Sequence, residues 1–243
     1  MSHPTTTPAS PVRVIGILSV AAFVVILNET IMSVALPRLM GEFNITEATV
    51  QWVTTAFMLT MAVIIPTTGW ILTRFPLRSV YLAAMLIFTA GTLVAALAPV
   101  FLVLVIGRVI QAIGTAIMMP LLMTTVMNMV PFEKRGRTMG IVGMVISAAP
   151  ALGPTTGGVI LEHLDWRWMF WAVLPIAVIV LVVGGLLLRN VTEPRHMKLD
   201  FVSVILSALG FSGLIYGLSS LGETARGSHS YRSGFRWRSA VSP

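Results

Sequence analysis

Two residues that could do chemistry, Glu29 and Arg108, lie inside long apolar stretches of the sequence. A charged side chain at the centre of a membrane-spanning helix costs about 2.5–3.5 kcal/mol on insertion scales, so each of them needs a partner or a role. Burial favours the protonated form of a carboxyl group, whereas a nearby arginine favours the ionised form. A pair of this kind could take up and release a proton. The alternative is a static ion pair that holds two helices together.

Two amides accompany these charges, because Asn28 adjoins Glu29 and Gln111 stands one helical turn from Arg108 on the same face. A helix rises about 1.5 Å per residue, which places Glu29 about 24 Å from the start of the first apolar stretch and Arg108 about 12 Å from the start of the fourth. These two stretches cross a membrane in opposite directions, so both charges are predicted at similar depth. We expect the four side chains to line one polar cavity, with Glu29 and Arg108 paired directly or through water.

Several other kinds of chemistry are excluded. The sequence has no cysteine, which rules out disulfides, thiolate metal sites and cysteine nucleophiles. Its four histidines, His3, His163, His196 and His229, all lie outside the apolar stretches. The string "AAPALGPTTGG" resembles a phosphate-binding loop, but no Lys-Ser or Lys-Thr follows it. We therefore expect no metal, no cofactor and no enzymatic activity, and an ion gradient rather than a nucleotide as the energy source.

The apolar stretches predict an all-α polytopic membrane protein. Apolar residues make up 56% of the 243 residues and charged residues 10%, whereas soluble domains contain about a quarter charged residues. A membrane-spanning helix needs about 20 mainly apolar residues. Seven stretches qualify, at roughly 14–36, 51–72, 80–98, 101–128, 139–160, 169–188 and 201–220. Trp52, Trp166, Trp168 and Trp171, near one boundary of these stretches, are interpreted as interfacial anchors.

The distribution of basic residues predicts the orientation, because lysine and arginine collect in cytoplasmic loops. The loops on the side opposite the N-terminus hold only Arg38 and Arg167. The side that holds the N-terminus carries nine basic residues: Arg13, Arg74, Arg78, Lys134, Arg135, Arg137, Arg189, Arg195 and Lys198. We expect a multi-pass protein of the plasma (inner) membrane with a cytoplasmic N-terminus. The net charge of +7 then reflects topology and contact with anionic lipids, and no nucleic-acid partner is expected.

Five segments are predicted along the chain: a cytoplasmic N-terminus over 1–13, a six-helix unit over 14–188, a cytoplasmic linker over 189–200, a seventh helix over 201–220 and a basic tail over 221–243. The tail is rich in Ser, Arg and Gly, and its arginines would lie outside, against the positive-inside rule. One interpretation is a disordered basic tail. The interpretation that we favour is a truncation or frameshift after the seventh helix.

The six-helix unit contains an internal repeat. "PTTGWIL", which begins at Pro66, resembles "PTTGGVIL", which begins at Pro154, 88 positions later. Similarly, "ALPRLM" around Pro37 resembles "MMPLLM" around Pro120, 83 positions later. Helices one to three and four to six are thus predicted to be copies of one unit. Three is odd, so the second copy enters the membrane from the opposite side, and such a three-plus-three inverted repeat is typical of transporters.

Several motifs resemble those of the major facilitator superfamily, in particular its 14-helix drug:proton antiporter branch. They are "LNETIMSVALP" over 27–37, "GRVIQAIGTA" over 107–116, "LGPTTGG" over 152–158 and, less closely, "GWILTRFPLRS" over 69–79. "DWRWMFW" over 165–171 also resembles the start of helix six in this family, and "LNETI" is similar to the lincomycin-resistance-like subgroup. The resemblance covers about residues 14–220 and implies the N-terminal six-helix bundle of the superfamily plus one further helix.

The resemblance implies roles for particular residues. Arg108 would take part in proton transfer, and the helix-five motif would favour export. The residues of that antiporter motif are Gly153, Pro154, Gly157 and Gly158, and those of a gating loop between helices two and three are Gly69, Arg74 and Arg78. Two departures stand out. The acid of the family's helix one falls at Asn28, and the carboxyl here is turned by about 100° around the helix, at Glu29. The loop motif has Thr73 and Pro76 where the family has an acid and a glycine.

These features lead to the expectation of proton-coupled efflux of lipophilic drugs or antibiotics, with protons and a lipophilic small molecule as partners. In the family the substrate path runs between two halves, so this chain alone is not expected to transport. Two alternatives stay open: an uptake carrier for another small solute, and an inactive truncated gene product. A seven-helix retinal protein is disfavoured, because residues 201–220 contain no lysine for a Schiff base.

Overall fold

The computed structural model describes residues 10–188, together with Gly210 and Gly213. The chain divides into two compact units, 1–199 and 200–243, and the helices described below all belong to the first. Six of these helices are long and apolar enough to cross a membrane, as predicted for residues 14–188. The predictions for residues 1–9, the 189–200 linker, the seventh helix and the tail lie outside the described residues.

The six spans follow one another through short connections. They are α1 (Pro11–Phe43), α3 (Trp52–Arg74), α4 (Leu77–Ala96), α5 (Phe101–Met129), α6 (Phe132–His163) and α7 (Arg167–Leu187). A single turn, α2 (Glu47–Val50), leads into α3. The predicted limits of most spans are close to these, but α1 and α6 continue beyond their apolar stretches. Buried Leu39 holds the extra turns of α1 against the bundle.

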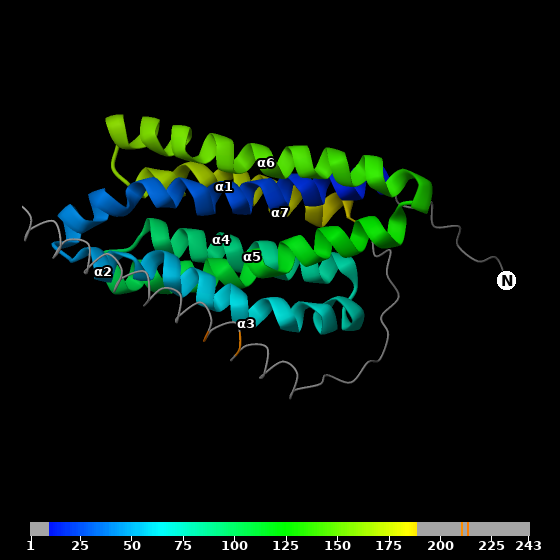
Figure 1. Cartoon of the computed structure of the whole chain (residues 1–243), viewed down its shortest axis with the longest axis horizontal. Coiled ribbons are helices and arrows are strands. Elements are labelled where there is room, and N and C mark those ends of the chain that lie inside the picture. The colour runs from blue at the N-terminus through cyan, green and yellow to red at the C-terminus, as the bar shows by residue number, and fades with distance from the viewer. Residues whose placement is uncertain (1–9, 189–209, 211–212, 214–243) are drawn as a thin grey trace, which may run out of the picture. The chain divides into compact units, whose positions relative to one another are not determined.

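The sequence shows why the helices begin and end where they do. Pro11 stands in the first turn of α1, where its missing N–H costs nothing. Asn44 closes α1 in the left-handed conformation, at φ 49°, with its N–H bonded to the carbonyl of Met40. Pro76 and Pro131 directly precede α4 and α6. These local signals keep the connections short, so consecutive spans run antiparallel (Figure 1).

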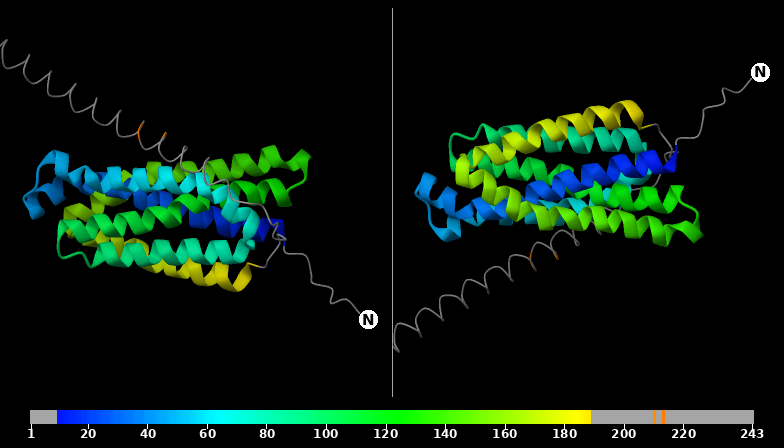
Figure 2. Two further views of the ribbon diagram at one scale, coloured as in Figure 1. Left: turned by 90° about the horizontal axis from the view of Figure 1, so that it is seen from below. Right: turned by 90° about the horizontal axis from the view of Figure 1, so that it is seen from above.

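The packing pairs have the pattern that an inverted repeat predicts. α1 packs along α6, which Figure 1 and the right view of Figure 2 show, and α5 packs along α3 (Figure 1). α5 also packs along α4, and α1 along α7. When the first three spans are exchanged in order with the last three, the α1–α6 pair becomes the α5–α3 pair, and the α4–α5 pair becomes the α7–α1 pair. The α4–α7 and α1–α5 contacts map onto themselves.

The α4–α5 contact is the most extensive in the bundle. It depends on three glycines, Gly91, Gly107 and Gly114, at which an added Cβ would overlap the neighbouring helix. A Cβ at Gly107, for example, would lie 2.8 Å from the backbone nitrogen of Ala95. The core is therefore centred on α1, α4 and α5, where at least half of each apolar span is buried. α3 and α6 leave most of their surfaces uncovered, with 22% and 17% buried.

Candidate functional site

Arg108 is fully buried in the first third of α5. One terminal nitrogen donates to Oε1 of Gln111 at 3.0 Å. The guanidinium carbon lies 4.1 Å from the ring centroid of Phe57 on α3, a cation–π contact. Its Nε and second terminal nitrogen have no hydrogen-bond partner among the described residues. A buried charge with free donors is costly, and such exceptions call for a functional explanation.

Gln111 anchors this arginine to the rigid side of the bundle. Its Nε2 donates to Oγ1 of Thr92 on α4 at 2.8 Å, and that hydroxyl donates to the carbonyl of Phe88 at 2.8 Å. Gly91 lies directly against Gln111, and a Cβ there would approach the Gln111 backbone nitrogen to 2.5 Å. The predicted pair of Arg108 and Gln111 is thus held in place by α4.

Glu29 approaches this group from α1, and Asn28 precedes it on the same helix. Glu29 is partly buried and lies within electrostatic reach of Arg108. Between the described residues, no hydrogen bond or ion pair within 4.0 Å joins the two. Asn28 is 3% exposed, and its Nδ2 lacks a partner among the described residues. In that part of the chain, the buried side-chain nitrogens and oxygens without a partner all belong to Asn28 and Arg108. These atoms belong to two of the four residues that were predicted to line one polar cavity.

Half of the predicted antiporter motif packs against the same turn of α1. Gly153 and Gly157 are buried, and an added Cβ would overlap Thr30 at the first position and lie 3.2 Å from the Ile31 carbonyl at the second. The Thr30 hydroxyl reaches the carbonyl of Ala149 on α6 at 3.4 Å. Pro154 is exposed, and nothing lies within 4 Å of a Cβ at Gly158. Gly153 and Gly157 of the motif therefore contact α1 at Thr30 and Ile31, the two residues that follow Glu29.

The three predicted gating-loop residues are not brought together. Gly69 is exposed on α3 with nothing within 4 Å of an added Cβ. Arg74 is exposed at the end of α3. Arg78 points to α7 and donates to the carbonyl of Gly185 from Nε at 3.0 Å and from a terminal nitrogen at 2.6 Å. Nearby, the Tyr81 hydroxyl donates to the carbonyl of Val180 at 2.6 Å.

A second polar cluster, at the end of the bundle opposite the N-terminus, was not predicted. Arg167 bonds Glu42 at 2.8 Å, Asp165 at 2.9 Å and the carbonyl of Ala98 at 3.2 Å. Trp166 donates its indole N–H to Glu42 and is fully buried. The interpretation of Trp166 as an interfacial anchor is therefore wrong, because its N–H has a carboxylate partner inside the protein. The available signal was three charged residues, Glu42, Asp165 and Arg167, outside the apolar stretches of a chain with few charges.

Comparison with known proteins identifies the family. The profile of the Major Facilitator Superfamily matches residues 18–224. The chain belongs to this superfamily. Among its relatives in this superfamily, the MFS-type transporter YcnB of Bacillus subtilis is 50% identical over 210 residues, which are 86% of this chain and 44% of YcnB. The lincomycin resistance protein LmrB of Listeria monocytogenes is 44% identical over 218 residues, 90% of this chain and 46% of LmrB.

A further relative and two solved structures extend the comparison. The multidrug resistance protein B homolog of Mycobacterium tuberculosis is 30% identical over 226 residues, 93% of this chain and 42% of that protein. The chain thus spans less than half the length of these curated relatives. The human organic anion transporter MFSD10 has the same fold, with a TM-score of 0.69 and 17% identity, over 83% of this chain and 54% of that one. A peptide transporter solved with sulfate gives a TM-score of 0.68 and 16% identity, over 86% and 46%.

Proposed function

We propose that this chain supplies the N-terminal half of a proton-coupled exporter of lipophilic drugs or antibiotics. The observation that carries the proposal is the state of Arg108, which is fully buried, has two nitrogens without a partner among the described residues, and lies near Glu29 without a direct ion pair. A purely structural ion pair would close to hydrogen-bond distance, since a buried charge needs all its partners. An open pair instead leaves room for a proton, water or a substrate group.

The proposed chemistry is a reversible proton transfer at the carboxyl group of Glu29. When the carboxylate is ionised, it balances the charge of Arg108 across the gap. When it accepts a proton from one side of the membrane, the guanidinium loses this compensation, and its free N–H donors favour another acceptor. Release of the proton to the other side restores the first state. A proton and a donor group of the substrate would compete for the Glu29 carboxylate, and such competition is the requirement for exchange transport.

The contact between α1 and α6 offers a way to couple this proton to a movement. Gly153 and Gly157 allow α6 to lie against Thr30 and Ile31, the two residues that follow Glu29. Small residues at a helix contact let the helices approach and slide. We propose that a shift of α6 along α1 alters the access of Glu29 to either side of the membrane. This would give the antiporter motif a physical role.

The class of substrate is proposed from the relatives, whose names refer to resistance to lincomycin and to multiple drugs. The uncovered surfaces of α3 and α6 are proposed to face the other half of a complete transporter, with the substrate path between the halves. We place the N-terminus in the cytoplasm and the protein in the plasma membrane, because of the nine basic residues on that side. The 243-residue chain by itself is not expected to transport.

A chimera tests the proposal. Residues 14–188 would replace the matching segment of LmrB of Bacillus subtilis, which is 43% identical over 210 residues. Everted membrane vesicles would be assayed for lincomycin transport driven by an imposed pH gradient. We expect the chimera to transport, Glu29→Gln to reduce gradient-driven transport to the level of vesicles without transporter, and Glu162→Gln, an exposed acid on α6, to leave it unchanged. Gradient-driven transport that survives Glu29→Gln would refute the role of Glu29.

A further inference from the structure

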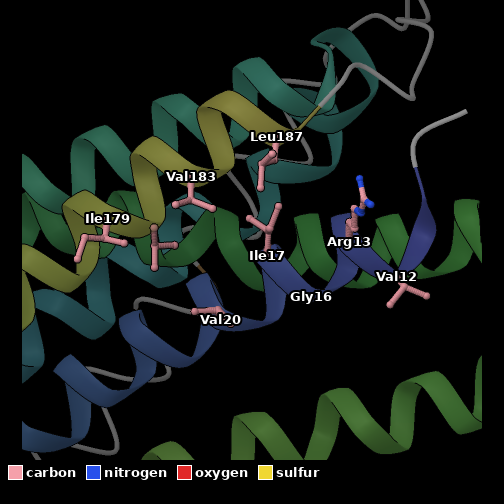
Figure 3. A pocket seen from close by; sticks show the side chains of 9 residues that line it. Val12, Arg13, Gly16, Ile17, Val20, Ile179, Val183 and Leu187 are labelled. Carbon is pink, nitrogen blue, oxygen red and sulfur yellow. The ribbon is translucent and has the colours of Figure 1, made fainter. Parts of the chain in front are cut away.

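The first turns of α1 separate two apolar grooves. One groove, with a volume of about 420 Å³, lies between α1 and the last half of α7, where Ile179, Val183 and Leu187 form its far wall (Figure 3). The other, with a volume of about 550 Å³, lies between α1 and the junction of α5 with α6, where Met129 and Val145 are among its lining residues. Both grooves are at the end of the bundle where α1 begins.

A narrow ridge of α1 divides the two grooves. Val12, Gly16 and Val20 are spaced four residues apart and line both of them. Val12 is 80% exposed and Val20 is 48% exposed, although both are apolar. Nothing lies within 4 Å of a Cβ at Gly16, so the space above the ridge is open. The two grooves therefore run beside each other with only a glycine between them at the middle of the ridge.

Each groove holds one basic side chain. Arg13 lines the first groove and Lys134 lines the second. Both residues are exposed, and neither forms an ion pair with a described residue. The hydroxyls of the second groove are already used, because Ser19 donates to the carbonyl of Ile15 at 2.7 Å and Thr138 donates to that of Lys134 at 3.1 Å. What each groove offers a ligand is therefore an apolar wall with one positive charge.

We propose that this surface binds one anionic phospholipid, with an acyl chain in each groove and the phosphate between Arg13 and Lys134. Two adjacent apolar grooves with cations match a two-chained amphiphile with a negative head group. A peptide segment fits less well, because its backbone N–H and C=O groups would find few partners on these walls. Basic residues at a membrane surface also attract anionic lipid, and each raises the affinity for it by a factor of about five.

The absence of cysteine makes a direct test simple, because an introduced Gly16→Cys would be the one thiol in the chain. The full 243-residue protein would be placed in phosphatidylcholine nanodiscs and labelled there with bimane. Its fluorescence would be titrated with brominated phosphatidylglycerol and, separately, with brominated phosphatidylcholine. We expect the glycerol lipid to quench at about thirtyfold lower mole fraction, the combined effect of two basic residues.

Two matched controls locate the effect. Arg13→Gln with Lys134→Gln should remove the lipid preference of the Gly16→Cys label, whereas Arg38→Gln with Arg137→Gln removes the same net charge from two residues that line neither groove and should preserve it. A label at Gly41→Cys, which is on the same helix and also has open space around its Cβ, reports ordinary bilayer lipid at the other end. Its response should not change with Arg13→Gln and Lys134→Gln.

Three results would overturn the proposal. Equal quenching of the Gly16→Cys label by the two lipids would mean ordinary bilayer contact. No quenching by either lipid would mean that another part of the chain covers the grooves. An equal loss of preference in both double variants would assign it to net charge alone. Native mass spectrometry adds an independent readout, because Gly16→Phe places a ring on the ridge, where nothing lies within 4 Å of a Cβ, and should displace bound phosphatidylglycerol while both basic residues are retained.

Discussion

Alanine at Gly153 should weaken the bundle, whereas alanine at Gly158 on the same helix should not. A Cβ at Gly153 would overlap the side chain of Thr30 and lie 3.2 Å from the backbone nitrogen of Ile31, whereas nothing lies within 4 Å at Gly158. Overpacking of this kind costs about 1–3 kcal/mol. Replacing glycine by alanine inside a helix gains about 0.5–1 kcal/mol, and this gain applies to both variants. The difference between them is therefore the overpacking cost, about 1–3 kcal/mol.

The free energy of unfolding would be measured on the 243-residue chain in mild detergent, by titration with sodium dodecyl sulfate and tryptophan fluorescence. A double-mutant cycle identifies the contact. Thr30→Ala removes the hydroxyl that Gly153→Ala would meet, so the double variant should recover part of the loss, with a coupling energy of about 0.5–3 kcal/mol. Equal stabilities of Gly153→Ala and Gly158→Ala, or a coupling energy of zero, would refute the close approach of α1 and α6 at this turn.

Two further predictions concern the ends of the bundle. Tyr81→Phe should lower the free energy of unfolding by about 0.5–1.5 kcal/mol, because it removes the hydrogen bond that the buried Tyr81 hydroxyl donates to the carbonyl of Val180; the same titration measures this, and an unchanged midpoint would contradict it. Arg167→Gln breaks bonds to Glu42, Asp165 and Ala98, but the arginine side chain is 31% exposed, so the loss should stay at about 1 kcal/mol or less and should shrink in high salt. A loss that is independent of salt would show that the contact to Ala98 dominates.

The sequence was sufficient for the spans within residues 10–188, because a span depends on properties along one helix. Apolar stretches of about 20 residues set the number of spans within residues 10–188. The helical rise alone placed Glu29 and Arg108 at similar depth, and the structure puts them within electrostatic reach. What the rise could not give is the gap between them, which depends on how α1 and α5 rotate about their axes. Packing against α6 and α4 sets those rotations.

The contacts that the sequence did not predict all involve a partner from another loop or helix. Trp166 was expected at the lipid interface, but it is buried, and Glu42, 124 positions earlier, accepts its N–H. The gating role of Arg78 stays a prediction, and the structure adds its hydrogen bonds to the carbonyl of Gly185 on α7. Of the glycines in the helix-five motif, Gly153 and Gly157 face α1 and Gly158 does not. A motif read along the chain does not say which of its positions face a neighbour.

The inverted repeat also explains why a groove exists beside α1. The tight contact between the end of α4 and the start of α5 corresponds, in the repeat, to the contact between the end of α7 and the start of α1. The first contact closes because Gly91 and Gly107 face the partner helix. In the second, Gly184 and Gly185 of α7 face Tyr81 and Leu82 of α4 instead, so branched side chains keep α7 away from α1. The contact between α1 and α7 is therefore more open than its counterpart between α4 and α5. The groove that remains has the shape and polarity to hold an acyl chain.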